Sequence, residues 1–153
     1  IVNKKDAYVR ERAKALGIEQ RYFTREDFYN SDKVVDLLTL RKTDLIVLAG
    51  FLWLVPQNLL AAFPNKIVNI HPALLPAYGG KGMYGHHVHQ AVIAARESKS
   101  GITIHYVNEQ YDRGDIIFQA ECSLTDQDTV ETLEEKIHLL EKEHYPKVID
   151  SIL

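Results

Sequence analysis

The chain has 153 residues, of which 46% are apolar, and its 18 basic and 21 acidic residues nearly balance. A single domain with a sizeable core is expected at this length, and the lack of a dense basic cluster argues against nucleic acid and anionic membranes as partners. The single cysteine excludes a disulfide framework, and no apolar run approaches the roughly 20 residues that a membrane span requires. We therefore expect a cytoplasmic protein that binds small molecules.

The N-terminal part of the sequence predicts two helices and one short strand. Asp6 is placed to cap a helix that ends near Leu16, and a strand is expected at residues 21–23. Ser31 is placed to cap a second helix, whose apolar face is expected to continue to Leu40. Each helix should turn its apolar face toward the core.

The middle of the chain predicts parallel strands. The run at residues 45–50 is continuously apolar, as expected for a central strand that is buried on both faces. Large apolar side chains follow at residues 51–55, in what should be a loop, and exposed loops rarely carry such residues without a functional reason. Pro56 suits the start of a short helix, and residues 67–71 predict the next strand, which Pro72 should end.

The C-terminal part predicts a hairpin between two helices. A helix is expected at residues 85–97, followed by strands at 101–107 and 116–122 that are joined by a hairpin-like turn. Asp128 is placed to cap a long final helix, which Pro146 should kink or restart. The whole pattern indicates an α/β domain with a mostly parallel sheet and an antiparallel edge near its C-terminus.

Two polar residues stand at the predicted end of the second parallel strand. Asn69 and His71 point to one side because side chains alternate along a strand. The carboxyl ends of strands are where open α/β sheets bind ligands. An amide can donate to an oxygen that becomes negative, and an imidazole can accept or return a proton, so the pair fits acyl-type transfer. Spacing alone leaves open the alternative that both residues only anchor the Pro72–Pro76 loop by hydrogen bonds.

Asp112 and Asp115 lie in the turn of the predicted hairpin. Aspartates in such turns usually cap or tighten the backbone. Asp112 gains a chemical role only if its carboxylate reaches His71, where it would stabilise the imidazolium and raise its pKa.

The histidines and glycines that follow the strand invite two other interpretations. His86, His87 and His89, together with His71, resemble a metal ligand set, but no zinc-protease signature accompanies them, and we expect neutral hydrogen-bonding residues. Residues 79–82 resemble a phosphate loop in composition, but they lack its Gly-Lys-Ser/Thr ending, which favours an ordinary flexible loop.

Three motifs carry a resemblance to a known family. Asn-Ile-His-Pro-Ala-Leu-Leu-Pro at residues 69–76, Leu-Ala-Gly-Phe-Leu at 48–52 and Tyr-Asp-Arg-Gly-Asp-Ile-Ile at 111–117 resemble glycinamide ribonucleotide (phosphoribosylglycinamide) formyltransferases, which are folate-dependent formyltransferases. The resemblance implies a single formyltransferase domain over residues 1–153 with a Rossmann-like fold and helices on both faces of the sheet. Relatives begin with a further strand and helix that bind the substrate phosphate, so we expect this domain to be incomplete at its N-terminus and to bind the ribonucleotide weakly.

The resemblance also implies a reaction and a set of site residues. The formyl group of 10-formyltetrahydrofolate, the co-substrate, would pass to the amine of glycinamide ribonucleotide in purine (IMP) biosynthesis without a metal. Asn69 would hold the formyl oxygen, His71 would be the general acid, and Asp112 would raise the pKa of that histidine and orient it. The implied folate-binding residues are Arg25, Leu52, Trp53, Leu54, Val55, Asn69, Asn108, Glu109, Gln110, Tyr111 and Asp112. The implied ribonucleotide-binding residues are Pro72, His138 and Glu141.

Three alternatives share the folate half of this site. A formyltetrahydrofolate hydrolase would direct water at the formyl carbon, and a methionyl-tRNA formyltransferase-like enzyme would be expected to carry glycine in place of Pro72 and a further basic domain. A non-catalytic folate-binding domain would need neither His71 nor Asp112. The expected partners are small molecules only, and the protein is expected to be a monomer or homodimer.

Overall fold

The computed structural model describes residues 1–153, which divide after Thr43 into two units. The first unit, residues 1–43, contains α1 (Val9–Ala15), α2 (Arg25–Tyr29) and α3 (Lys33–Leu40). The predicted strand at residues 21–23 is reduced to a single parallel bridge between Val2 and Tyr22. None of the helices in the chain is both long and apolar enough to cross a membrane.

The predicted cap of the first helix is wrong. Asp6 lies in a turn that the Ala7 N–H closes on the Lys4 carbonyl, so the helix begins only at Val9. No residue of α1 is buried, although an apolar stripe toward the core is predicted.

The second predicted helix is displaced for a similar reason. Thr24 and Asp27 form a capping box that starts α2, a helix the sequence pattern does not indicate. The Ser31 hydroxyl donates to the Asp27 carbonyl at 2.7 Å and completes α2, so α3 begins after Asp32. Leu40, expected in the core, is 79% exposed at the end of α3.

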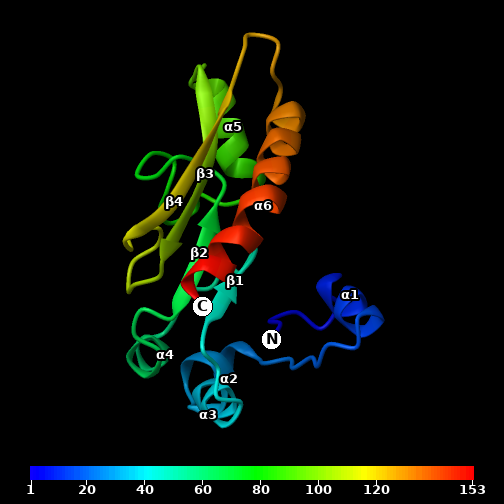
Figure 1. Cartoon of the computed structure of the whole chain (residues 1–153), viewed down its shortest axis with the longest axis vertical. Coiled ribbons are helices and arrows are strands. Elements are labelled where there is room, and N and C mark those ends of the chain that lie inside the picture. Colours follow the sequence, from blue (N-terminus) through cyan, green and yellow to red (C-terminus); the bar gives the residue numbers. More distant parts are fainter. The chain divides into compact units, whose positions relative to one another are not determined.

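The second unit, residues 44–153, is built on a four-stranded sheet in the order β1-β2-β3-β4 (Figure 1). Its strands are β1 (Ile46–Leu48), β2 (Ile67–His71), β3 (Lys99–Tyr106) and β4 (Ile116–Ser123). Its helices are α4 (Gln57–Ala62), α5 (His86–Ala94) and α6 (Val130–Ile152). This order of elements confirms the predicted α/β class, the end of β2 at His71 and the C-terminal hairpin.

The sheet is mixed, and the expected parallel pairing is met only between β1 and β2. β3 pairs antiparallel with β2 as well as with β4, so the hairpin supplies half of the strands. The apolar run at residues 45–50 therefore forms an edge strand of this sheet and not a central one, and Val47 is 40% exposed.

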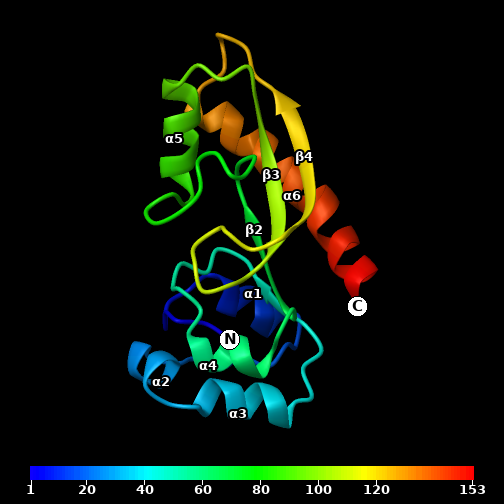
Figure 2. The ribbon, with the colours of Figure 1, turned by 90° about the vertical axis from the view of Figure 1, so that its left-hand side faces the viewer.

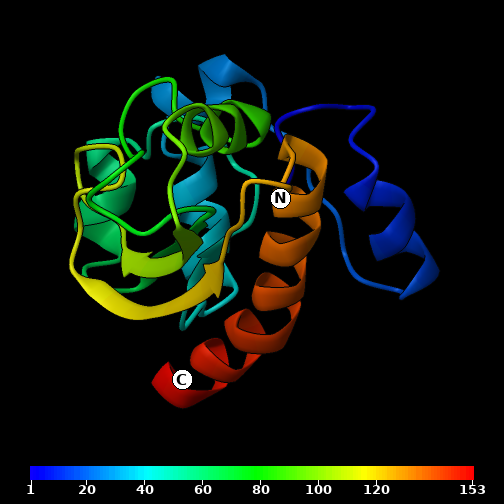
Figure 3. The same ribbon diagram turned by 90° about the horizontal axis from the view of Figure 1, so that it is seen from above.

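Alternation along β2 and β3 separates an apolar face from a polar face. Val68 lies opposite Tyr106, and Ile70 lies opposite Ile104; this face packs against α6 (Figures 2 and 3). A neighbouring core cluster joins α5, α6 and β3 through Val88, Val92, Ile102, Leu133 and Ile137. The other face carries Asn69 opposite His105 and His71 opposite Thr103. The packing of the apolar face thus fixes the direction of the polar side chains.

The long helix α6 corrects the predicted cap and one of the two effects expected of Pro146. Its capping box is formed by Thr129 and Thr132, whereas the Asp128 carboxylate accepts hydrogen bonds from Thr125 and Thr132 and pairs with Lys136. Pro146 lies inside the helix, which does not restart there and continues to Ile152.

Candidate active site

A cavity of about 440 Å³ opens where β1 stops and β2 continues. Leu48, the last residue of β1, is paired with Asn69, so β2 extends two residues beyond its parallel neighbour. The cavity is lined by the loop that follows β1, the end of β2, the loop before α5, the turn between β3 and β4, and one face of α6. It thus lies at the carboxyl end of the parallel pair, as the sequence predicts.

Asn69 is held by a buried histidine on the adjacent strand. Its Nδ2 lies 3.2 Å from Nε2 of His105, whose Nδ1 donates to the Tyr106 carbonyl at 2.7 Å. When the His105 ring is neutral, Nε2 is the accepting nitrogen of that tautomer, so the Asn69 amide donates one hydrogen to it and keeps the second free for a ligand. The hydrogen-bonded amide therefore has a fixed orientation.

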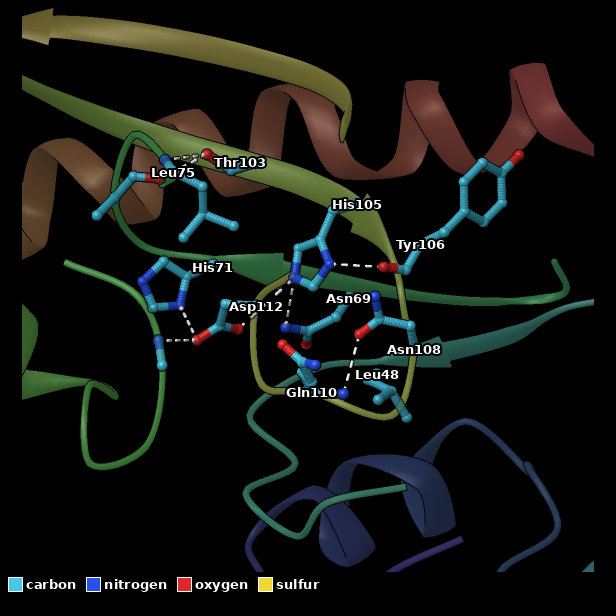
Figure 4. A network of polar contacts seen from close by, with 12 residues as sticks. Leu48, Asn69, His71, Leu75, Thr103, His105, Tyr106, Asn108, Gln110 and Asp112 are labelled. Atoms are coloured by element: carbon cyan, nitrogen blue, oxygen red, sulfur yellow. Dashed lines mark hydrogen bonds and ion pairs between the residues drawn. The ribbon is translucent and has the colours of Figure 1, made fainter. Parts of the chain in front are cut away.

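Both ring nitrogens of His71 have a partner, and Figure 4 shows the contact with Asp112. Nε2 donates to the Tyr78 carbonyl at 2.8 Å, and Nδ1 lies 3.5 Å from Oδ2 of Asp112. Because a carbonyl can only accept, Nε2 carries a proton in every state, and Nδ1 is the nitrogen that gains or loses one. The titrating nitrogen is therefore the one that faces the carboxylate.

Asp112 brings the distant hairpin turn to the end of β2. Figure 4 shows its carboxylate between the imidazoles of His71 and His105, and the second oxygen, Oδ1, lies 3.7 Å from His105 Nε2. The Gly80 N–H donates to Oδ2 at 2.9 Å. Burial alone would raise the pKa of Asp112, but its contacts with His105, His71 and Gly80 outweigh burial and hold this pKa below its usual value.

The tight path of the turn depends on a glycine. A Cβ atom on Gly114 would lie 1.8 Å from the Tyr106 carbonyl oxygen, so no larger residue fits without moving the backbone. Asp112 itself adopts a φ of 56°, which is uncommon for a residue with a side chain but comparatively frequent for aspartate. These two positions set the course of the turn over β2.

The pKa of His71 departs from the expectation. Burial lowers this pKa below its ordinary value, and the opposing effect of Asp112 does not fully restore it. Asp112 thus acts in the predicted direction, but the net pKa of His71 is lowered and not raised. The sequence shows the charges near this histidine but not how deeply its ring is buried.

The Pro72–Pro76 loop is anchored by other residues than Asn69 and His71. The Thr103 hydroxyl donates to the Ala73 carbonyl at 2.7 Å and accepts from the Leu75 N–H at 2.9 Å. Gln119 donates to both the Leu75 carbonyl and the Thr103 hydroxyl. Spacing alone leaves open that Asn69 and His71 only anchor this loop. In the structure, Thr103 and Gln119 anchor it.

The residues predicted to bind folate fall into three groups. Leu52, Trp53, Leu54 and Val55, together with Asn69, Gln110, Tyr111 and Asp112, line the cavity. Asn108 and Glu109 belong to the same turn, where the Asn108 side chain accepts from the Gln110 N–H, but they do not line the cavity. Arg25 lies in the first unit, where its guanidinium stacks on the Tyr29 ring at 5.2 Å.

The residues predicted to bind the ribonucleotide also line the cavity. Pro72 follows β2, and His138 and Glu141 lie one turn apart on α6. Burial raises the pKa of Glu141. The nearby Tyr145 hydroxyl donates to the Leu48 carbonyl at 2.8 Å and ties α6 to the end of β1.

Sequence patterns alone do not place two buried histidines, His105 and His89, at this cavity. His105 alternates with Ile104 and Tyr106 along a strand, a pattern that marks a polar face but does not reveal that Asn69 lies opposite. His89 on α5 is 3% exposed and lines the cavity, and burial lowers its pKa. His86 and His87 are exposed, and the histidines do not join other ligands in a group of three or more that could hold a metal ion.

Comparisons with known proteins agree with this geometry. A sequence model of the formyl transferase family matches residues 1–149. The chloroplastic phosphoribosylglycinamide formyltransferase of Arabidopsis thaliana is 41% identical over 99% of this chain, which spans 54% of that protein. Phosphoribosylglycinamide formyltransferase of Bacillus subtilis is 39% identical over 100% of this chain and 78% of its own length.

A solved structure also resembles the chain closely. The crystal structure of phosphoribosylglycinamide formyltransferase from Streptococcus pneumoniae matches with a TM-score of 0.87 and 35% identity, over 98% of this chain and 83% of that one. This match confirms the predicted fold.

Proposed function

The chain belongs to the formyl transferase family, and we propose that it transfers the formyl group of 10-formyltetrahydrofolate to the amine of glycinamide ribonucleotide. The proposal is carried by one observation: an amide, an imidazole and a carboxylate meet at the end of β2, in a cavity with an apolar loop on its wall. Both relatives named above are phosphoribosylglycinamide formyltransferases, which supports the ribonucleotide amine as the acceptor over water or the amine of a charged tRNA.

In the first step the amine attacks the formyl carbon, and the formyl oxygen becomes negative. The free hydrogen of the Asn69 amide donates to this oxygen, and the contact with His105 keeps the amide turned toward it. A donor that is already oriented costs no reorganisation when the charge develops.

In the second step the tetrahedral intermediate collapses, the bond from carbon to the folate nitrogen breaks, and that nitrogen takes up a proton. His71 supplies the proton from Nδ1, since Nε2 remains bonded to the Tyr78 carbonyl. The attacking nitrogen must release one proton to form the neutral formamide, and the Nδ1 that has just been vacated takes it up, which restores the imidazolium. Asp112 stabilises the imidazolium before the transfer. The distance of 3.5 Å between Nδ1 and Oδ2 exceeds that of an ordinary hydrogen bond, so this proton remains available to the leaving nitrogen.

The two substrates occupy opposite walls of the cavity. Leu52, which is 49% exposed, and its neighbours Trp53, Leu54 and Val55 offer apolar surface and backbone groups to the pterin, with Gln110 and Tyr111 on the facing turn. Pro72, His138 and Glu141 face the ribonucleotide, whose hydroxyl groups can donate to the Glu141 carboxylate. Asn108 and Glu109, in the same turn as Gln110, remain candidates for other parts of the folate. A folate-binding role of Arg25 stays a prediction of the sequence resemblance.

We further propose that residues 1–153 belong to one formyltransferase domain, which acts as a monomer or homodimer in the cytoplasm with small molecules as its only partners. The chemistry described above needs no metal, because each proton and each developing charge has a side chain to receive it. With glycinamide ribonucleotide as the acceptor, the reaction belongs to purine biosynthesis.

A folate-product absorbance assay tests this function. The purified protein receives 10-formyltetrahydrofolate with saturating glycinamide ribonucleotide, with charged tRNA, or with water alone. We expect the deformylated folate to appear only with the ribonucleotide. Equal rates without an acceptor would identify a hydrolase, and release with tRNA alone would identify a tRNA formyltransferase. Folate binding without turnover under any condition would identify a non-catalytic binding domain.

A further inference from the structure

We propose that Tyr78 and Glu97 are positioning residues that hold His71 and Asp112 in their reactive arrangement. The inference rests on the proposed function, because it concerns how the proton donor of that reaction is kept in place. Neither side chain contacts the reacting groups directly; each acts through the backbone segment formed by residues 78–80.

This segment contacts both members of the acid pair. The Tyr78 carbonyl accepts from His71 Nε2 at 2.8 Å, and the Gly80 N–H donates to Asp112 Oδ2 at 2.9 Å. Between them, a Cβ atom on Gly79 would lie 2.5 Å from the Leu75 side chain and 3.3 Å from Asp112 Cβ. The backbone therefore passes closely over the site, and a shift of this segment would move both hydrogen bonds together.

The segment is not secured by regular secondary structure. Tyr78 has a φ of 55°, a left-handed conformation that is unfavourable for a residue with a large side chain. Gly80, Gly82 and Gly85 follow with positive φ, so the chain beyond Tyr78 is intrinsically adaptable. Something outside the backbone must hold this conformation.

The Tyr78 side chain provides that restraint. Its ring packs against the core cluster that includes Val88 and Val92 of α5, and its hydroxyl donates to Oε1 of Glu97 at 2.6 Å. Glu97 follows the end of α5 and is joined to it by its own N–H, which donates to the Val92 carbonyl. A continuous connection thus runs from α5 through Glu97 and Tyr78 to the ring of His71.

The hydrogen bond between Tyr78 and Glu97 is expected to be a strong one. The hydrogen bond to Glu97 raises the pKa of Tyr78, so the phenol remains a donor at physiological pH. The carboxylate of Glu97 makes it a charge-assisted hydrogen bond, which is shorter and stronger than one between neutral groups. Its loss is expected to loosen the Tyr78 carbonyl without removing any group from the cavity.

A double-mutant cycle measures this connection. Tyr78→Phe removes only the hydroxyl, and Glu97→Ala removes its acceptor, whereas Glu97→Gln keeps an oxygen that can accept. We expect each disruptive change to lower kcat by roughly 3- to 10-fold with little change in KM for the formyl folate. The double variant should lose no more than either single variant, and Glu97→Gln should remain close to wild type. Glu121→Ala, which breaks an exposed pair with Lys99, is the matched control.

A spectroscopic signature distinguishes positioning from general weakening of the fold. In the ¹H–¹⁵N spectrum of the neutral His71 ring, wild type should show a protonated Nε2 and an unprotonated Nδ1. In Tyr78→Phe and Glu97→Ala both signals should move toward the average of two exchanging tautomers, and thermal stability should change little.

Unchanged ring signals and unchanged kcat in both variants would overturn the inference, as would losses that multiply in the double variant. The ring signals decide the question even if the protein transfers no formyl group. In that case the proposed function fails, while the role of Tyr78 and Glu97 in holding His71 is still confirmed or refuted.

Discussion

Asp112 Oδ2 faces His71 Nδ1 across 3.5 Å, although 41 positions separate the two residues along the chain. The contact exists because the hairpin turn folds back over the end of β2 and because Gly80 holds the same carboxylate oxygen. It joins a proton donor to the group that stabilises its charged form, inside a cavity large enough for a substrate.

Replacing the Asp112 carboxylate should reduce the protonated fraction of His71. Asp112→Asn removes the one charge that raises the pKa of His71 against the effect of burial, so this pKa should fall further. A smaller fraction of His71 is then protonated at any given pH, and the limb of the kcat profile that reports His71 should move to lower pH. We expect kcat to fall by roughly 10- to 1,000-fold.

The neighbouring aspartate provides the control for this experiment. Asp115→Asn changes an exposed carboxylate in the same turn and should leave both the rate and the His71 titration unchanged. An ¹H NMR titration of His71 checks the direction of the shift. A pKa of His71 that rises in Asp112→Asn would contradict the electrostatic role assigned to Asp112.

Removing the oriented amide should affect the transition state more than substrate binding. Asn69→Ala takes away the donor for the formyl oxygen and leaves His105 Nε2 without its present partner. We expect kcat to fall by about 100- to 1,000-fold, with a much smaller change in KM for either substrate. Steady-state kinetics separate the two constants, and Asn30→Ala, at the end of α2 in the first unit, is the control. A rise in KM alone would show that Asn69 only binds the substrate.

Binding of the ribonucleotide, the formyl acceptor, should depend on pH through Glu141. Burial raises the pKa of Glu141, so its carboxylate takes up a proton at a higher pH than an exposed glutamate does. As pH falls through this raised pKa, KM for the ribonucleotide should increase, because the acceptor of its hydroxyl groups is lost. In Glu141→Gln this KM should be high and independent of pH, while KM for the folate stays constant. Glu135→Gln, on the exposed face of α6, should match wild type.

Loss of the hydrogen bonds that anchor the Pro72–Pro76 loop should lower the stability of the protein. Thr103→Val preserves the shape of a fully buried residue but removes the hydroxyl that bonds Ala73, Leu75 and Gln119. The unsatisfied buried groups should lower the free energy of unfolding by about 1–3 kcal/mol. Urea unfolding measures this change, and the exposed Thr39→Val on α3 should alter stability by less than about 0.5 kcal/mol. A loss for Thr103→Val as small as that of the control would contradict the anchoring role.

Local patterns were sufficient to predict much of the second unit. A β-branched run ended by proline predicts β2 and its final residue, and alternation correctly places Asn69 and His71 on one face. The large apolar side chains after β1 predict a loop with a functional role, and this loop lines the cavity. These features depend on neighbouring residues only, and the sequence displays them directly.

Other features depend on contacts between distant segments. His105 alternates like any half-buried strand residue, and only the register between β2 and β3 sets it opposite Asn69. The lowered pKa of His71 reflects how deeply its ring is buried, which charge patterns do not reveal. Asp128 predicts the cap of α6 one residue too early, because its carboxylate bonds Thr125, outside the helix, as well as Thr132 and Lys136 within it. The contact between Tyr78 and Glu97 spans the whole of α5 and has no local signature.

The rate of formyl transfer by His71→Ala, with both substrates saturating, tests the central claim most directly. His87→Ala, which removes an exposed imidazole on α5, is the control, and folate binding measured on the same samples verifies that the cavity is intact. With His71 as the proton donor, the account predicts a loss of roughly 100- to 10,000-fold in kcat for His71→Ala and wild-type turnover for His87→Ala. Wild-type turnover by a folded His71→Ala protein would contradict it.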